Sequence, residues 1–406
     1  MRLGTWMPFP AATALLAAFA QTTIAEPTLR RQTEAAGAAY VALQTAAAER
    51  LEREAPAPPP GPAALQLSVD GAMVPLVGKG QWAEVKTLAV GVVQPPTREG
   101  GKSVVRTTAL SYFSRLTDHE TFTRLALVET HRRGVATAGT VVAISDGAGW
   151  AQSFVDAHRP DAVRILDWCH AAGYLGQVAS ACFGAAGTGA SSWLAAQVRE
   201  LLDGDPDRVL GKLRGLRDDL TARVAAAGGD AAAQAKLATV ATSLHYLASR
   251  RAQIAYAAFR AQGYPIGSGS VESANKLVVE VRLKGAGMHW ARAHVDGMVA
   301  LRTVVCGDRW AEAWPSIAAA LRRQARARLR HKRLARRATP PCPPGRTPPA
   351  PILPPPADPP SVLALPSTRH DHPPPPAPHA PAPPRAPARP SPTHPWRRYQ
   401  QPAPVN

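Results

Sequence analysis

The chain has few acidic residues and no cysteine motif. These two features bear on its partners and on the kinds of metal site and cross-link to expect. Its 29 Asp and Glu residues stand against 47 Lys and Arg, which gives a formal net charge of +18. A protein this basic usually faces a polyanion, and nucleic acid is the commonest one. The four cysteines contain no Cys-x-x-Cys pair. A zinc motif and a disulfide framework are therefore not expected, and a reducing compartment is favoured.

Long apolar runs are also lacking. The longest candidate, residues 11–20 after Arg2, resembles the apolar part of a signal peptide, but Pro8 and Pro10 precede it and a poor cleavage site follows. The run is too short to cross a bilayer as a helix. We therefore expect a cytoplasmic, nucleoid-associated protein with no membrane partner. A secreted basic protein is the less favoured alternative.

Composition divides the chain into five segments. Residues 1–54 have a helical pattern and are either packing helices or a truncated DNA-binding region. A proline-rich linker follows at 55–62, and an α/β domain is predicted for 63–312. Residues 313–337 predict a basic helix. The Pro-rich residues 338–406 predict a disordered tail, in which weak metal binding by histidines is the alternative.

Within 63–312 the apolar periodicity predicts the order β-β-β-α-β-α-β. The first strand, 65–69, ends at an Asp70-Gly71 turn signal, with a return strand at 73–77 and a third at 84–93. Two later apolar runs end at Asp146 and Asp167. An Ala-rich helical pattern, about 175–262, predicts an all-helical insertion. A Gly/Ser turn then leads into a helix that carries Glu272.

Three carboxylates thus stand at the ends or starts of elements: Asp70, Asp146 and Glu272. Brought together in an open sheet, they would repel one another unless a divalent cation neutralised them. Oxygen ligands favour Mg²⁺ or Mn²⁺ over zinc. Two such ions can activate water or a 3′-hydroxyl for phosphodiester chemistry. Glu272 alone is more often a helix-start residue favoured by the helix dipole.

The most specific motifs are Asp167-x-x-His170 and the turn Gly267-Ser268-Gly269 followed by Val271-Glu272. With residues 68–71, 82–86, 145–150 and 282–290, these segments resemble the ISKra-type family of bacterial insertion-sequence transposases. The order of elements and carboxylates resembles the wider group of ribonuclease-H-like DDE transposases, including Mutator-like relatives. The resemblance covers about residues 25–312.

This resemblance implies a ribonuclease-H-like core and a metal-dependent enzyme that cleaves DNA at the ends of an insertion sequence and joins them to target DNA. Asp70, Asp146 and Glu272 would bind two Mg²⁺ or Mn²⁺ ions. Asp167 and His170 would orient the site, or Asp167 would be the second ligand in place of Asp146. Further residues would contact DNA: Lys276, Arg282, Lys284, His289, Trp290, Arg322, Arg323, Arg326 and Arg330.

The expected partners are the terminal repeats, target DNA and further copies of the chain, because two element ends must be paired. Fewer residues precede Asp70 than in most of the family. The alternative function is therefore a truncated or inactive relic that only binds DNA.

Overall fold

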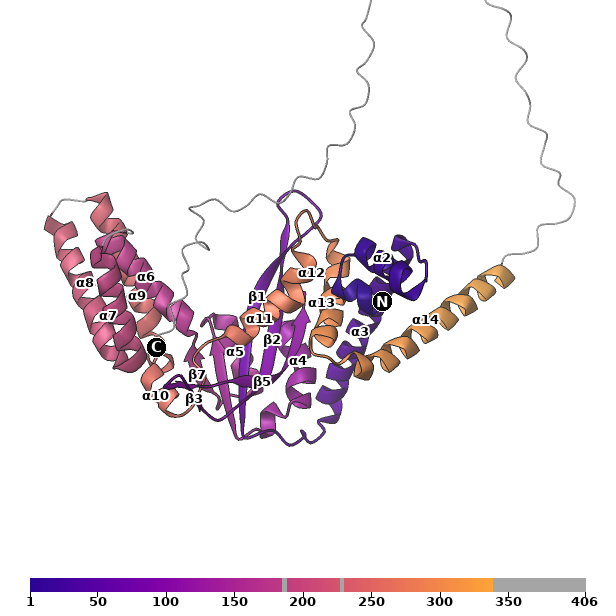
Figure 1. Cartoon of the computed structure of the whole chain (residues 1–406), viewed down its shortest axis with the longest axis horizontal. Coiled ribbons are helices and arrows are strands. Elements are labelled where there is room, and N and C mark those ends of the chain that lie inside the picture. Colours follow the sequence, from indigo (N-terminus) through magenta and orange to yellow (C-terminus); the bar gives the residue numbers. More distant parts are fainter. Residues whose placement is uncertain (185–187, 227–229, 339–406) are drawn as a thin grey trace, which may run out of the picture. The chain divides into compact units, whose positions relative to one another are not determined.

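The computed structural model describes residues 1–184, 188–226 and 230–338. Within these residues the protein is an α/β structure with one mixed five-stranded sheet surrounded by helices (Figure 1). The predicted α/β class is confirmed. The predicted tail, 338–406, lies outside the described residues apart from Ala338.

The sheet has the strand order β5-β2-β1-β6-β7. Strands β1, β2 and β5 are antiparallel neighbours, whereas β6 and β7 run parallel to β1. A small separate hairpin, β3–β4, is inserted between β2 and β5. The strands are β1 Ala64–Pro75, β2 Trp82–Val93, β3 Thr97–Glu99, β4 Lys102–Val104, β5 Thr107–Arg115, β6 Thr140–Ser145 and β7 Val163–Leu166.

The predicted turn at Asp70-Gly71 is wrong. Strand β1 continues through both residues and stays paired with β2 as far as Pro75. A Cβ on Gly71 would meet the Glu84 side chain of β2, and that flexible side chain would have to shift to make room. The chain reverses later, at residues 77–81. Asp70 therefore lies inside a long strand rather than at its end.

The two faces of the sheet are covered by different helices. Leu65, Leu67 and Val69 of β1 pack in one cluster with Phe122 of α4 (His119–Arg132) and Phe154 of α5 (Gly149–His158). Because side chains alternate along a strand, Gln66, Ser68 and Asp70 face the other side. There Ala72, Val74 and Leu76 pack on a helical segment composed of α11 Gly269–Ala274, a π-helical stretch Asn275–Glu280 and α12 Val281–Leu283.

Three N-terminal helices pack on the same core: α1 Arg2–Trp6, α2 Phe9–Ala20 and α3 Glu26–Glu54. Helix α3 crosses α13 (Arg292–Cys306) at backbone contact. A Cβ on Gly37 would lie 2.5 Å from the carbonyl oxygen of Gly297, so larger residues would push the two helices apart. Helix α14 (Trp310–Ala338) follows α13.

The predicted helical insertion lies between β7 and the Glu272 segment. Helices α6 to α9 pack side by side in a bundle, which begins at Trp168, and the short α10 leads back to the sheet (Figure 1). Their bounds are α6 Trp168–Phe183, α7 Thr188–Asp203, α8 Pro206–Ala226, α9 Ala231–Ala248 and α10 Tyr256–Ala261.

Candidate functional site

A row of polar residues crosses the middle of the sheet. Asp70 lies opposite Thr87 of β2, and Thr87 lies opposite Ser114 of β5. The two hydroxyl oxygens are 3.0 Å apart, and both side chains are almost completely buried. Buried polar side chains at consecutive strands need partners. The row therefore leads across the sheet to Asp70.

On the parallel side, the strand registers bring three aspartates to one level. The pairing of β1 with β6 ends with Leu67 opposite Ala143. Extending this register by three residues puts Asp70 level with Asp146, which lies directly after the end of β6. Ser145 pairs with Leu166, which makes Asp167 level with Asp146. Neighbouring strands are about 4.8 Å apart. Asp70, Asp146 and Asp167 thus occupy neighbouring strands at the same height.

Asp70 is held by two hydrogen bonds. Its Oδ1 accepts from the Gly71 amide at 2.7 Å, and its Oδ2 accepts from Nδ2 of Asn275 at 2.8 Å. Burial raises the pKa of Asp70 above its ordinary value, and the charge of Asp146 raises it further, against the lowering effect of the two hydrogen bonds. Asn275 Oδ1 is buried without a hydrogen-bond partner. This corner of the site therefore disfavours the charged form of Asp70 and holds an amide oxygen that lacks a donor.

The Asp146 loop is clamped from the helical insertion. Its own Oδ1 accepts from the Ala148 amide at 2.9 Å. The Tyr246 hydroxyl of α9 donates to the Asp146 carbonyl oxygen, and Arg250 Nη2 donates to the Gly147 carbonyl at 2.8 Å. Gly147 has φ of +81°, where a side chain would be strained and would also meet Arg250. The insertion thus helps to position Asp146.

Asp167 has a bracing role in the structure. Its side chain is only 1% exposed and accepts from the His170 amide at 3.0 Å, His170 Nδ1 at 2.9 Å and the Ser268 amide at 2.6 Å. Burial raises the pKa of Asp167, but these hydrogen bonds outweigh it and the net shift is downward. The hydrogen bond to Asp167 raises the pKa of His170. Asp167 therefore ties α6 to the turn that precedes Glu272.

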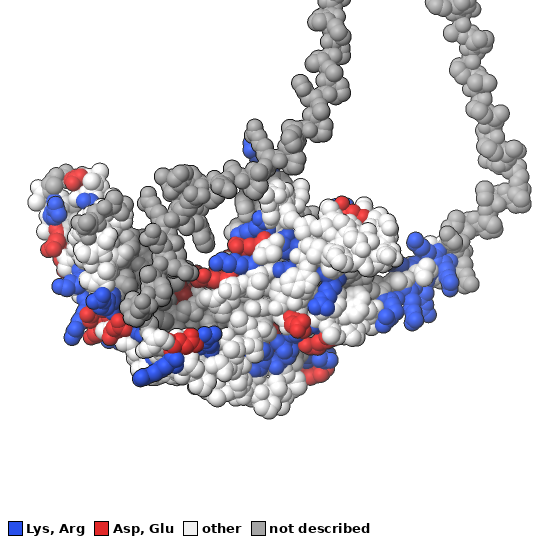
Figure 2. Space-filling view, in the orientation of Figure 1, with Lys and Arg blue, Asp and Glu red and all other residues white. Residues whose placement is uncertain are grey.

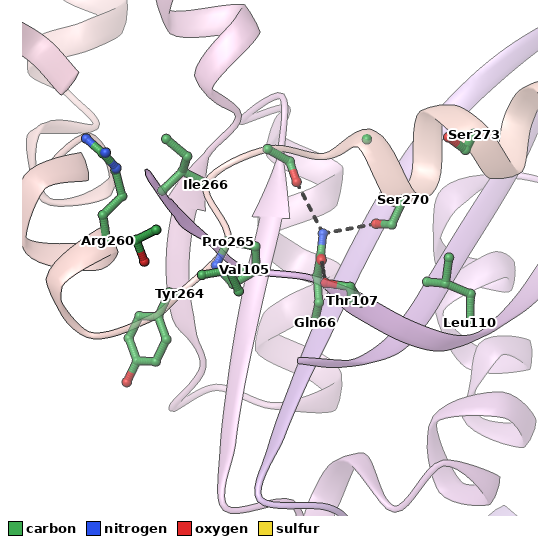
Figure 3. Close-up of a pocket in the computed structure, with 13 residues that line it drawn as sticks. Gln66, Val105, Thr107, Leu110, Arg260, Tyr264, Pro265, Ile266, Ser270 and Ser273 are labelled. Atoms are coloured by element: carbon green, nitrogen blue, oxygen red, sulfur yellow. Dashed lines mark hydrogen bonds between the residues drawn. The ribbon is translucent and has the colours of Figure 1, made fainter. Parts of the chain in front are cut away.

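The turn before Glu272 is fixed from a second side by Gln66 (Figure 3). Gln66 Nε2 donates to the Gly267 carbonyl at 3.3 Å and to Ser270 Oγ at 3.0 Å, and its Oε1 accepts from Thr107 Oγ1 at 2.6 Å. These residues line a cavity of about 510 Å³ beside the helix. Glu272 itself is exposed, with Oε1 3.4 Å from Ser268 Oγ.

The oxygen atoms around Asp70 favour binding of a cation that prefers oxygen ligands, but a complete set of ligands is not assembled there. Asp70 and Asp146 repel each other, and the orphaned Asn275 Oδ1 adds an acceptor beside them. In the described part of the chain, however, no three His, Cys, Asp or Glu side chains lie together as a ready metal-binding group. Glu272 is separated from the two aspartates as its side chain stands, although its helix contacts Asp70 through Asn275.

The residues predicted to contact DNA after Glu272 divide by exposure. Lys276 and His289 are exposed, and Lys284 pairs with Glu280 at 2.8 Å. Arg282 and Trp290 are buried, at 2% and 8% exposure. The guanidinium of Arg282 lies over the Trp290 ring and donates to the Gly4 carbonyl. These two side chains hold the N-terminal helices and do not present a surface to DNA.

The outer part of α14 is a second cationic surface, visible as the blue side chains along that helix (Figure 2). Residues 322–335 are all exposed. At about 100° per residue, Arg322, Arg326, Arg330 and Arg333 fall on one face of the helix, with Arg323 beside it. We call these four arginines the α14 stripe. In the described residues none of the four has an acidic partner.

Two residues that position the site escaped the sequence analysis. Asn275 lies three residues after Glu272, and the i, i+3 spacing puts the two on one side of the helix. Gln66 belongs to the alternating polar positions 66, 68 and 70 in an otherwise apolar strand. That alternation was a usable signal, because buried polar residues in a core strand call for specific partners.

No protein-family model matches the chain, and no curated protein matches it either. The described residues contain no helix with the length and apolar character needed to span a membrane. The three described cysteines are free.

Proposed function

We propose that the protein is a DNA transposase with a ribonuclease-H-like core, in which Asp70, Asp146 and Glu272 hold two Mg²⁺ or Mn²⁺ ions. The observation that carries this proposal is the level alignment of Asp70 and Asp146 on adjacent parallel strands. The order of the main elements, β-β-β-α-β-α-β, agrees with the core that the family resemblance implies. Asn275 supports the proposal further, because it holds the helix of Glu272 against Asp70.

Bound metal ions would activate water or a 3′-hydroxyl and stabilise the leaving oxygen in a phosphodiester. The protein's own residues would supply the frame. Asp167 and Gln66 fix the turn before Glu272. Tyr246 and Arg250 fix the loop after Asp146. Asn275 anchors the helix of Glu272 beside Asp70, and the exposed Glu272 side chain would have to turn toward the two aspartates.

DNA is the proposed substrate, and the α14 stripe supports this. Four arginines on one helix face, none with an acidic partner among the described residues, suit a row of phosphates. The proposed assembly is a homo-oligomer on DNA, since two element ends must be processed together, and the proposed location is the bacterial nucleoid.

The test is a strand-cleavage assay with the full chain, Mg²⁺ or Mn²⁺, and a labelled duplex that carries the sequence flanking the gene. We expect metal-dependent nicking at a defined end. Asp146→Asn should reduce it by at least about 100-fold, because a metal ligand is lost. Asp167→Asn should weaken it less, since Asp167 acts through the turn. Asp218→Asn, on the exposed surface of α8, is the matched control and should leave it unchanged.

A greater loss with Asp167→Asn than with Asp146→Asn would make Asp167 the ligand. Salt-sensitive DNA binding by the wild type without cleavage, with either metal, would contradict the enzyme and favour the DNA-binding relic.

A further inference from the structure

A second cavity, of about 530 Å³, lies between the N-terminal helices and the loop before α13. Its ionisable lining consists of three arginines, two histidines and one glutamate. Arg30 and Arg31 come from the first turns of α3, His289 from the loop, and His294 from α13. We call it the Arg30 cavity. Glu34 is the one acidic residue in its lining, and it lies 3.8 Å from His294 Nδ1.

Arg282 is an independent sign of what the cavity binds. It lines the cavity, yet its side chain is almost completely buried between the rings of Phe9 and Trp290. Within the described residues its hydrogen bonds go to one backbone carbonyl, that of Gly4. Among the described residues no carboxylate pairs with it. A buried positive charge without an acidic partner is costly, and a bound anion would offset that cost.

The two exposed arginines are also free to bind. Arg31 donates only to its own helix, to the Pro27 carbonyl and the Thr28 hydroxyl. Within the described part of the chain neither Arg30 nor Arg31 has an acidic partner. Guanidinium groups that converge on a cavity suit a phosphate, whose oxygens accept several hydrogen bonds at once.

The cavity lies on the strand that carries Asp70. Val77, directly after β1, lines it, and Leu76 bridges to Trp290. At about 3.3 Å per residue, Val77 is roughly 23 Å from Asp70 along the chain. That distance corresponds to about seven phosphates of one DNA strand at 3.4 Å each. A strand cut near Asp70 could therefore reach the cavity.

We propose that the Arg30 cavity binds a backbone phosphate of the DNA substrate, several nucleotides from the point of cleavage. The choice of DNA rests on the proposed function. The shared chemistry is a phosphate group, which a free nucleotide or inorganic phosphate could also supply.

The test compares two double variants with the same loss of charge on the same helix. Arg30→Ala with Arg31→Ala removes the exposed cations of the cavity. Arg50→Ala with Arg53→Ala removes two exposed arginines at the other end of α3, outside the cavity. All four side chains are exposed, so both variants should fold, which thermal unfolding checks. Binding of a labelled DNA duplex is measured by fluorescence anisotropy over a range of salt concentrations.

We expect the cavity variant to bind DNA about 10-fold more weakly at 0.15 M salt, with a salt dependence reduced by about one phosphate contact. The control should change affinity less than about twofold. Equal losses in both variants, or none in either, would overturn the proposal.

Competition identifies the source of the phosphate. Inorganic phosphate and dTMP are added at increasing concentration to wild type and both variants, with ionic strength held constant. Displacement of DNA only at concentrations far above that of competing duplex supports DNA as the ligand. Tight binding of dTMP or phosphate, lost in the cavity variant while DNA affinity is unchanged, would overturn it. Asp146→Asn separates the proposed cleavage activity from the proposed phosphate site. It should abolish cleavage and leave DNA binding at the Arg30 cavity intact.

Discussion

Two groups of arginines in this protein differ in their surroundings. Arg282 and Arg302 are buried, and they hold helices together through backbone carbonyls and aromatic rings. The arginines of the α14 stripe are fully exposed and have no acidic partner in the described residues. All carry the same charge in the sequence. The comparison shows that a large net charge does not reveal which cations face a partner.

The buried pair also explains why the N-terminal helices belong to the core. Arg302 donates from Nη1 to the Thr5 carbonyl at 3.2 Å and from Nε to the Val278 carbonyl at 3.3 Å, and it also donates to Leu277. Helix C-terminal carbonyls carry partial negative charge, which stabilises a nearby cation. The same guanidinium therefore joins α1 to the segment that follows Glu272.

The largest expected effect is that of removing a buried arginine. Arg302→Ala would leave a cavity and several unpaired buried carbonyls, and it should lower the free energy of unfolding by about 3–5 kcal/mol. Denaturant unfolding measures this. Limited proteolysis should also find α1 and α2 newly accessible, because Arg302 holds the Thr5 carbonyl. Arg322→Ala is the matched exposed variant, expected within about 0.5 kcal/mol of wild type. Equal losses of unfolding free energy in Arg302→Ala and Arg322→Ala would show that the buried arginine does not stabilise the fold more than the exposed one.

The exposed group should matter for DNA instead. Changing Arg322, Arg326, Arg330 and Arg333 together to Ala should reduce DNA affinity by about 100-fold or more at 0.15 M salt, and lower the salt dependence by up to about four contacts. The unfolding free energy should hardly change. The control replaces four exposed cations of α8 by Ala: Arg208, Lys212, Arg214 and Arg223. If that variant loses as much affinity, the stripe has no special role.

The smallest expected effect concerns a buried basic group that can lose its charge. Burial lowers the pKa of His158 to about 4, from 6.5 in an unfolded chain. Between these values the unfolded chain binds a proton and the folded chain does not. Stability therefore falls as pH drops from about 6.5 to 4, by about 2–3 kcal/mol.

Unfolding measured at pH 7, 5.5 and 4.5 tests this prediction, and His158→Gln should flatten the profile over that window. His119→Gln, at an exposed helix start, should keep the wild-type dependence. A His158→Gln profile as steep as that of wild type would show that other groups cause the acid sensitivity.

The α/β class and the helical insertion were predictable because they depend on local periodicity. The three antiparallel strands were misassigned, because the predicted strands 65–69 and 73–77 both belong to β1 and the third strand is β5. The predicted end of the first strand at Asp70 was wrong. Asp-Gly is a common turn signal, yet at this place pairing with β2 continues to Pro75 and outweighs the local preference. In the same way, Asp167 resembles a strand-end ligand in sequence. Its bonds to Ser268 and His170 instead make it a brace between segments about a hundred residues apart.

The sequence by itself determined the basic character of the chain, the polar alternation at Gln66, Ser68 and Asp70, and the carboxylates that follow apolar runs. Composition and short-range spacing suffice for these. Only the tertiary structure decided that Asp70 and Asp146 are level, that Asn275 joins the Glu272 helix to Asp70, and that Arg282 is buried while the α14 stripe is exposed. Strand register, contacts between distant segments and burial arise when the whole chain packs, so no local pattern specifies them.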